Sequence, residues 1–433
     1  MKFYSTNNRS HEVTLREAVL KGLAADGGLY IPEYIPELEN SFFSNLEKKN
    51  IPEIAFEVLG NFTKNEIDQS DLRNIVEDAF NFDAPVVSLD EKYKVLELFH
   101  GPTLAFKDFG ARFMARTMSH FIKGEDKTLN ILVATSGDTG SAVANGFYKT
   151  EGINVFILYP KEKVSEIQEK QLTTLGENIT ALEIEGTFDD CQALVKQAFV
   201  DKELNERLVL SSANSINIAR LLPQSIYYFN AYKQVSDGDN EVVVCVPSGN
   251  LGNLTAGLFA SEMGLPIKKF IAATNANSVF SEYVNSGVFT ARSSVKTISN
   301  AMDVGNPSNL ARINELYKND INIIRKVIFS NSHTDEQTKE GIREVYDKYN
   351  YLIDPHGSVG YLAMKDYFES SDSEKETGII LETAHPAKFK EDVENVLGIN
   401  INLPLQLQEV IGKEKVSVQL SNKYEHLKDF LFH

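Results

Sequence analysis

Residues 242–264 read VVVCVPSGNLGNLTAGLFASEMG: a short apolar run, a turn rich in glycine and asparagine, and an apolar segment with helical spacing. Five consecutive apolar residues, four of them valine, are typical of a strand that is buried on both faces. The turn sits at the start of the predicted helix and contains Gly249, Asn250, Leu251, Gly252 and Asn253. Backbone N–H groups converge at a helix N-terminus, and glycine permits close approach, so this turn can cradle a phosphate. An ordinary tight turn fits the same residues, and the spacing matches neither the dinucleotide-binding fingerprint nor the P-loop.

The same order of strand, turn and helix recurs on both sides of this stretch. Apolar runs of strand length are ILVA (131–134), VFILYP (155–160), FIAATN (270–275) and GIILET (378–383). Buried strands that alternate with helices predict an α/β fold with open, twisted, mainly parallel sheets flanked by helices, in two lobes. We expect an N-terminal mixed α/β domain over 1–95 and two lobes over 96–235 and 236–433, which can interleave. Ligands of such folds bind at the carboxyl ends of the strands, where the glycine-rich turns fall.

A second polar turn, TSGDTGSA (135–142), follows the predicted strand at 131–134. Ser136, Asp138 and Thr139 supply hydroxyl groups and a carboxylate beside a helix N-terminus, where a small carboxylate can bind. Ser, Thr and Asp are also preferred capping residues, so a purely structural turn fits the same pattern. Two such loops in one chain favour a ligand with two anionic groups, such as a phosphate-bearing cofactor with a carboxylate substrate.

One lysine stands at the start of a predicted helix in HGPTLAFKDFGARFMARTMSHF (100–121). Lys107 lies between Phe106 and Asp108, just after a Gly-Pro turn. Burial and a helix N-terminus both lower the pKa of a lysine, which makes its amine a Schiff-base nucleophile. A surface lysine on an amphipathic helix is the alternative interpretation.

Composition excludes several classes of protein. The 433 residues carry 43 Lys plus Arg and 61 Asp plus Glu, a net charge of -18, which argues against nucleic-acid and membrane partners. The two cysteines, Cys191 and Cys245, lie far apart in apolar segments and outside any metal-ligand spacing, so we expect buried thiols and no metal site.

No stretch has the ~18 apolar residues of a spanning helix, and the N-terminus lacks a signal pattern. We therefore expect a cytoplasmic protein. Since screening confines surface charge to about 8 Å, a locally positive cleft can still bind phosphates.

Six stretches, in order along nearly the whole chain, resemble the threonine synthase family. They are HGPTLAFKDFGARFMA, ATSGDTGSAVA, SANSINIARLLPQ, VPSGNLGNLTAG, SNAMDVGNPSN and ETAHPAKFKE. The resemblance implies a pyridoxal-phosphate enzyme of the fold type that includes tryptophan synthase β and cysteine synthase. It also implies the last step of threonine biosynthesis, in which O-phosphohomoserine and water give threonine and phosphate.

The resemblance also implies roles for individual residues. Lys107 matches the lysine that forms the Schiff base, and residues 249–253 match the cofactor-phosphate loop, in which the family often has Phe in place of Leu251. Thr383 matches the residue near the pyridine nitrogen. Ser136, Asp138 and Thr139 match the loop that receives the substrate α-carboxylate and lies beside the cofactor 3'-oxygen. Many relatives of the wider fold have Asn at the aspartate position. A carboxylate there needs a protonated partner. Asn214, Ser215 and Arg220 match the residues that bind the substrate phosphate. Asn217, His385 and Lys388 lie in the same motifs without an assigned role.

Other readings stay open from the sequence alone. A serine/threonine dehydratase, or a phospho-lyase that makes 2-oxobutyrate from O-phosphohomoserine, would use the same scaffold. A phosphate- or amino-acid-binding protein without catalysis is a more distant alternative. The sequence fixes neither a monomer nor a homodimer, and it leaves allosteric regulation open. The final pattern YEHLKDFLF (424–432) predicts a docked terminal helix.

Overall fold

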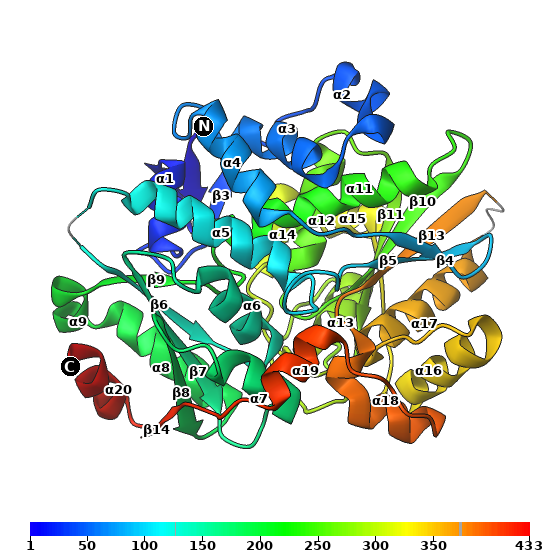
Figure 1. The fold of residues 1–433 in the computed structure, drawn as a ribbon. Helices are drawn as coiled ribbons and strands as arrows, with labels where there is room; N and C mark the ends of the chain where they lie inside the picture. The colour runs from blue at the N-terminus through cyan, green and yellow to red at the C-terminus, as the bar shows by residue number, and fades with distance from the viewer. Residues whose placement is uncertain (126, 372–374) are drawn as a thin grey trace.

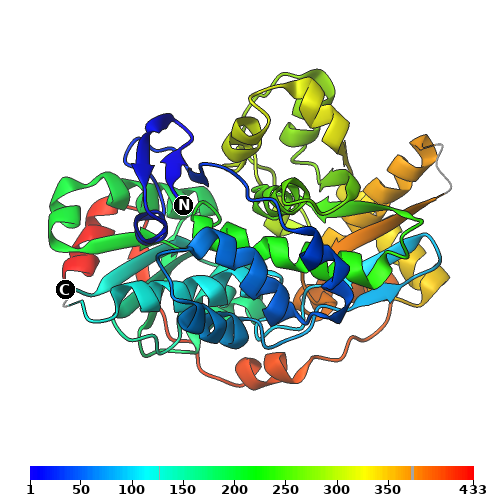
Figure 2. The same ribbon diagram turned by 90° about the horizontal axis from the view of Figure 1, so that it is seen from above.

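The structure, a computed structural model, describes residues 1–125, 127–371 and 375–433 and contains three β-sheets surrounded by helices (Figure 1). The N-terminal sheet is antiparallel, in the order β2-β1-β3, with strands Phe3–Ser5 (β1), Asn8–Val13 (β2) and Tyr30–Pro32 (β3). Its helices are α1 (Leu15–Lys21), α2 (Asn40–Ser44), η1 (Leu46–Lys48), α3 (Ile51–Thr63) and α4 (Gln69–Ala79). Figure 2 shows α3 and α4 lying across the middle of the molecule, and they contact α11 (Ile226–Val235) and α5 (Lys107–Ile122) respectively.

The second sheet has five strands that all pair in parallel. Its order is β14 (Val418–Ser421), β8 (Ile179–Glu185), β7 (Ile153–Pro160), β6 (Leu129–Ala134) and β9 (Val209–Ser212). All six residues of β6 are buried, as expected of a strand covered on both faces. The helices of this lobe are α5, α6 (Asp138–Phe147), α7 (Glu166–Thr173), α8 (Phe188–Val200) and α9 (Lys202–Arg207).

The third sheet has six strands, of which only the edge strand β4 is antiparallel to its neighbour. Its order is β12 (Ile328–Ser332), β11 (Ile267–Thr274), β10 (Glu241–Pro247), β13 (Glu376–Glu382), β5 (Tyr93–Glu97) and β4 (Val86–Ser88). Its helices include α12 (Gly252–Glu262), α13 (Val279–Ser286), α14 (Leu310–Leu316), α15 (Ile321–Val327), α16 (Asp335–Tyr349) and α17 (Pro355–Ser370). The predicted fold class, two mainly parallel sheets flanked by helices, is confirmed.

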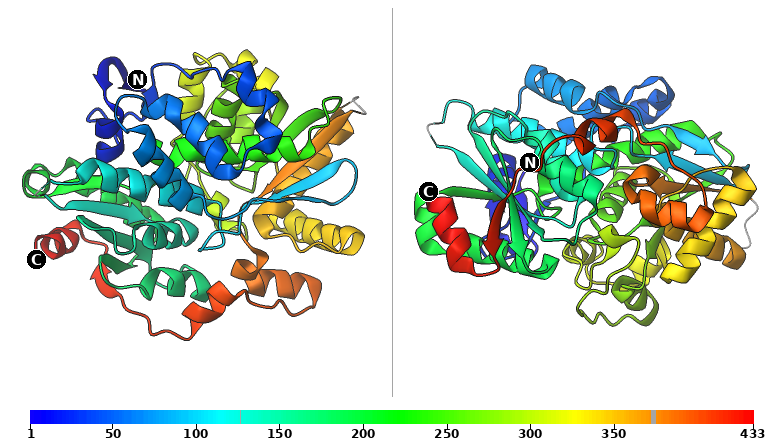
Figure 3. Two further views of the ribbon diagram at one scale, coloured as in Figure 1. Left: turned by 45° about the horizontal axis from the view of Figure 1, so that its top comes forward. Right: turned by 60° about the horizontal axis from the view of Figure 1, so that its bottom comes forward.

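The sheets interleave along the chain. Strands β4 and β5 precede the five-stranded sheet in sequence but belong to the six-stranded one. Strand β14 follows the six-stranded sheet in sequence but belongs to the five-stranded one. After β13 the chain forms η4 (Pro386–Phe389), α18 (Lys390–Leu397) beside α16, and α19 (Leu405–Ile411) beside α7. It then reaches β14 and α20 (Tyr424–Phe432), so the C-terminal segment spans both lobes (Figure 3). The division at residues 95 and 235 stays a prediction.

Burial supports two further expectations. Leu427 and Leu431 of α20 are buried in the apolar cluster of the five-stranded sheet, as predicted for a docked terminal helix. Cys191 and Cys245 are both free thiols with no exposed surface, and burial raises the pKa of the Cys191 thiol to about 12. Across the described ranges, none of the helices has the length and apolar character needed to cross a membrane.

Candidate active site

The turn between β6 and α6 is organised by Thr135. Its hydroxyl oxygen accepts the backbone N–H groups of Gly137 at 2.9 Å and Gly140 at 2.8 Å. Gly137 has a φ of 140°, which a side chain would strain, and a Cβ there would lie 2.5 Å from the Gln168 amide carbon. Helix α6 begins at Asp138, so Ser136, Asp138 and Thr139 stand at its N-terminus as predicted from the sequence.

The turn between β10 and α12 is the predicted phosphate loop. Leu251 adopts a left-handed φ of 60° immediately before α12 begins at Gly252. A leucine in this conformation costs about 1–3 kcal/mol and persists where the surrounding structure requires it. A Cβ on Gly249 would lie 2.7 Å from the carbonyl oxygen of Ala301, so glycine is needed there. The loop therefore stands at a helix N-terminus, whose first N–H groups have no partner within the helix itself.

Two asparagines of this loop have different surroundings. Asn250 Nδ2 donates to Ser215 Oγ at 2.6 Å, and Asn250 Oδ1 accepts Ser308 N–H at 2.6 Å. Asn253 Oδ1 accepts the hydroxyl groups of Tyr227 and Tyr228, each at 2.6 Å. Asn253 Nδ2 is buried and finds no hydrogen-bond partner within the described parts of the chain. This buried amide nitrogen is therefore available to donate a hydrogen bond to a ligand.

The segment after β9 carries the residues expected at the substrate phosphate. Asn214 Nδ2 donates to the Ala134 carbonyl at 2.9 Å, which joins this segment to the end of β6. Arg220, on α10 (Ile218–Leu221), is 2% exposed and donates from one terminal nitrogen to the Ala213 carbonyl at 2.7 Å. Its Nε has no partner among residues 1–125, 127–371 and 375–433. Burial lowers the Arg220 pKa to about 10, so the guanidinium stays charged near neutral pH.

Asn217 and Arg312 have structural roles next to this segment. The Asn217 side chain caps α10 through the Ala219 N–H at 3.0 Å and donates to the Val19 carbonyl at 2.9 Å. Arg312 is fully buried and donates to the carbonyl groups of Tyr30 and Ile216. It ties the N-terminal sheet to the predicted substrate segment. The sequence pattern does not predict this role, because a lone arginine in an amphipathic helix gives no signal of burial.

Lys107 is the first residue of α5, and its side chain is 14% exposed. Its Nζ lies 3.5 Å from Asp138 Oδ2. The other oxygen of that carboxylate lies 2.8 Å from Lys388 Nζ and accepts Gln168 Nε2 at 3.0 Å. Burial lowers the Lys107 pKa, as predicted from the sequence. Burial opposes the charge on Asp138, but Lys388 and Lys107 outweigh it and hold the Asp138 pKa well below its usual range.

The segment after β13 lies against the residues that precede Lys107. Phe106 N–H donates to the Thr383 carbonyl at 2.9 Å, and His385 N–H donates to the Leu104 carbonyl at 3.0 Å. Thr383 is therefore brought beside Lys107, and its side chain is buried. His385 Nδ1 accepts Ala387 N–H at 3.0 Å and caps η4, and burial lowers the His385 pKa to about 4. His385 is thus a neutral capping residue near pH 7.

These contacts join the predicted site residues into one region at the carboxyl ends of the strands. Lys107 contacts Asp138, and Asn214 donates a hydrogen bond to the end of β6. Ser215 accepts a hydrogen bond from Asn250, and the Thr383 carbonyl accepts one from the backbone of Phe106. The elements come from both large sheets. One site residue, Asp138, gains two partners that spacing could not reveal, because Gln168 and Lys388 are far from it in the sequence.

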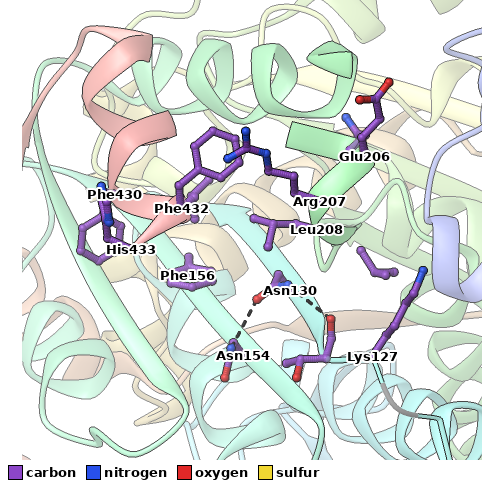
Figure 4. Close-up of a pocket in the computed structure, with 14 residues that line it drawn as sticks. Lys127, Asn130, Asn154, Phe156, Glu206, Arg207, Leu208, Phe430, Phe432 and His433 are labelled. Carbon is purple, nitrogen blue, oxygen red and sulfur yellow. Dashed lines mark hydrogen bonds between the residues drawn. The ribbon is translucent and has the colours of Figure 1, made fainter. Parts of the chain in front are cut away.

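A cavity of about 700 Å³ lies elsewhere, at the beginnings of β6 and β7 (Figure 4). Asn154 Nδ2 donates to Asn130 Oδ1 at 3.3 Å on its floor, and Arg207 lies over the Phe432 ring with 4.7 Å to the centroid. Open α/β sheets bind ligands at the opposite, carboxyl ends of their strands. This cavity is therefore separate from the candidate active site.

A buried carboxyl pair lies behind Thr383, where β13 ends. Glu382 and Asp354 are both fully buried, and Glu382 Oε1 accepts Asp354 N–H at 2.6 Å. His356 Nε2 accepts Ala301 N–H at 3.2 Å, so the ring proton lies on Nδ1, 3.3 Å from Asp354 Oδ1. Burial, then the charges of Asp354 and Glu97, raises the Glu382 pKa well above its usual range. Burial and these charges therefore favour the protonated form of Glu382.

This raised pKa makes stability depend on pH. The stability contributed by protonated Glu382 is full below its unfolded pKa of about 4.3 and is lost as pH rises through the higher folded value. We expect Glu382→Gln to reduce the fall in thermal unfolding midpoint between pH 6 and pH 9, because glutamine stays neutral. The exposed residue Glu425 provides a control as Glu425→Gln. Equal pH slopes in wild type and Glu382→Gln would contradict this assignment.

Three family models match nearly the whole length of the chain. The model "Threonine synthase N terminus" matches residues 2–80, "Pyridoxal-phosphate dependent enzyme" matches 85–382, and "Threonine synthase, C-terminal" matches 357–431. A threonine synthase from Haemophilus influenzae is 46% identical over 435 aligned residues, covering 100% of this chain and 99% of the relative. The chain belongs to the threonine synthase family.

Solved structures of the threonine synthase family agree with this assignment. The crystal structure of the Escherichia coli threonine synthase matches with a TM-score of 0.93 and 43% identity, covering 100% of this chain and 99% of that one. A structure of pyridoxal-phosphate-bound threonine synthase from Brucella melitensis matches with a TM-score of 0.93 and 36% identity, covering 100% and 98%. The fold and the family therefore agree over the full length.

Proposed function

We propose that this chain converts O-phosphohomoserine and water to L-threonine and phosphate, with pyridoxal phosphate as cofactor. Membership of a pyridoxal-phosphate-dependent threonine synthase family supports both the reaction and the cofactor. The observation that carries the site assignment is the amine of Lys107, which is largely buried and lies 3.5 Å from the Asp138 carboxylate. A desolvated lysine is suited to act first as a nucleophile and then as a base.

The residues present fit the cofactor. Lys107 would hold its aldehyde carbon, and residues 249–253 would hold its phosphate through the α12 N-terminus. The buried Asn253 Nδ2, without a partner in the described chain, is consistent with an anionic ligand beside this loop. Asp138 would lie at the 3'-oxygen, and Thr383 at the ring nitrogen. When bound, pyridoxal phosphate acts as an electron sink for carbanions next to the substrate amine.

The substrate would be held at both ends. Ser136 and Thr139, at the N-terminus of α6, suit the α-carboxylate through hydroxyl and backbone N–H groups. Asn214, Ser215 and Arg220 suit the phosphate. The Arg220 guanidinium is charged and buried, and its Nε lacks a partner within the described residues, so it can bind phosphate oxygens in a way that a lysine cannot imitate.

The chain's own groups then handle protons and the leaving group. Once released, the Lys107 amine would take a proton first at Cα and then at Cβ of the substrate. Removal of the Cβ proton promotes departure of the γ-phosphate, whose charge Arg220 and the neighbouring amide and hydroxyl groups would stabilise. A proton would then be delivered to Cγ, water would add at Cβ, and return of a second proton to Cα would complete threonine.

The phosphate loop yields a direct test of cofactor binding. In Gly249→Ala the new Cβ would lie 2.7 Å from the Ala301 carbonyl oxygen and 3.0 Å from Met302 Cα, so the loop backbone must move. We expect affinity for pyridoxal phosphate to fall roughly tenfold or more, or about 1.4 kcal/mol. Absorbance titration of the apoprotein measures this.

A glycine remote from the loop serves as the control. In Gly60→Ala the nearest atom to the new Cβ is Leu72 Cδ2 at 3.6 Å, so no rearrangement is required. This variant should keep wild-type cofactor affinity and gain about 0.5–1 kcal/mol of helix stability. Unchanged affinity in Gly249→Ala would remove the role given to this loop.

Product analysis separates the proposed reaction from its neighbours. A phospho-lyase would form 2-oxobutyrate from O-phosphohomoserine, and a dehydratase would act on serine or threonine without releasing phosphate. Threonine and phosphate in equal amounts support the proposal, whereas 2-oxobutyrate as the main product would replace it. The remaining expectations, a monomer or homodimer in the cytoplasm that binds neither nucleic acid nor membrane, stay predictions.

A further inference from the structure

The active site holds two amines and one carboxylate in a row. Asp138 lies 2.8 Å from Lys388 Nζ and 3.5 Å from Lys107 Nζ, and all three side chains are at most 14% exposed. One carboxylate can neutralise only one ammonium fully, and a second buried charge without a partner is costly. The geometry must therefore favour one amine as the charged partner.

Three observations favour Lys388 as the charged partner of Asp138. Its side chain has no exposed surface, its distance to Asp138 is the shorter one, and its Nζ also donates to the Thr103 carbonyl at 2.9 Å. Gln168 Nε2 donates to the same Asp138 oxygen that faces Lys388, at 3.0 Å, and fixes the carboxylate in this orientation. Lys107 has the longer contact, to the other oxygen, and its Nζ also lies 5.1 Å from the centroid of the Phe106 ring.

The other charged groups nearby do not offer Lys388 a better partner. Asp108, on α5, accepts Thr103 N–H at 2.9 Å and Thr103 Oγ at 2.6 Å, so both of its oxygens are engaged. Arg220, on α10, and Lys388 both lower the Lys107 pKa in addition to burial, while Asp138 raises it. His385 lies on the same segment as Lys388, and burial lowers its pKa to about 4, so it brings no charge near neutral pH.

We propose that Lys388 is a positioning residue whose ammonium forms the ion pair with Asp138. Lys107 is then left as the uncharged amine that the reaction needs. The inference rests on the proposed function and assigns a role to a lysine that the motifs alone leave without one. Because Lys388 follows β13 and Asp138 follows β6, the ion pair also joins the two large sheets at the site.

The test is a pH titration of the visible absorption band of the holoenzyme. In Lys388→Met, Asp138 loses its ammonium partner and interacts with the nitrogen of Lys107 instead. We expect the midpoint of the band's pH transition to rise by about 1–3 units, as for a cation that gains an unshared carboxylate within 4–6 Å. Lys388→Arg keeps the charge and should restore most of the wild-type midpoint. Lys390→Met, two residues away on an ion pair with Glu394, should leave the midpoint unchanged.

A second pair of variants guards against failure of Lys388→Met to fold. Asp138→Asn should lower the midpoint, because Lys388 then acts on Lys107 without compensation. Lys388→Met combined with Asp138→Asn removes both charges, leaves no unpaired buried ion, and should return the midpoint toward wild type. A double variant with the same midpoint as Asp138→Asn alone would overturn the proposal, as would an unshifted midpoint in folded Lys388→Met. A wild-type protein without a visible band would instead contradict the proposed function itself.

Discussion

Lys107→Ala is expected to release phosphate from O-phosphohomoserine at a rate lower by a factor of about 10³ or more, because it removes both the nucleophile and the proton-transfer group. The residue stands at the first turn of α5, and its amine is close enough to Asp138 for an electrostatic contact. Coupled phosphate detection measures the rate, and absorbance reports whether pyridoxal phosphate remains bound.

Chemical trapping distinguishes loss of the covalent link from loss of the fold. Borohydride should fix the cofactor to wild type, with a shift of the visible band, and should fix none to Lys107→Ala. Lys196→Ala, at an exposed position on α8, is the matched control and should behave as wild type. Wild-type phosphate release by Lys107→Ala would show that another group performs the chemistry.

Arg220→Ala is expected to lower kcat/KM for O-phosphohomoserine by about 10- to 150-fold, which corresponds to hydrogen bonds to a charged group worth about 1.5–3 kcal/mol. The cofactor content should stay at the wild-type level, because the arginine is assigned to the substrate phosphate. Arg220→Lys keeps a charge but cannot form a paired contact with phosphate oxygens, so it should recover only part of the loss.

The control and the contrary outcome for Arg220 follow from its position. Arg207→Ala, with an exposed side chain beside the separate cavity, should leave kcat/KM unchanged (Figure 4). If Arg220→Ala lost its bound cofactor while saturating pyridoxal phosphate restored normal kinetics, the arginine would belong to the cofactor site instead.

Most of the fold could be predicted from local patterns. The buried strands β6, β7, β10 and β13 each carry a continuous apolar run, and each glycine-rich turn after β6 and β10 leads directly into a helix. Strand β14 gave no such signal, because all four of its residues are partly or fully exposed. Its place beside β8 depends on tertiary contacts more than 230 residues apart, which periodicity cannot reveal.

The site was predictable as far as its motifs are local. The turns at 136–139 and 249–253 and the lysine at the start of α5 could all be located from residue types and spacing. The sequence also indicated that Asp138 needs a protonated partner, but it could not choose that partner. Lys388 lies 2.8 Å away because residues 383–385 pair with residues 104–106 just before α5, and η4, which carries Lys388, follows directly. Arg312 escaped notice because burial of an arginine depends on distant carbonyl groups.

The products formed from O-phosphohomoserine distinguish the proposed reaction from its alternatives. Purified protein is incubated with O-phosphohomoserine, with and without added pyridoxal phosphate, and threonine and phosphate are quantified together. We expect both products to form in equal amounts, removal of the cofactor to abolish them, and its return to restore them. Formation of 2-oxobutyrate in place of threonine, or product formation that does not depend on pyridoxal phosphate, would contradict the proposed function.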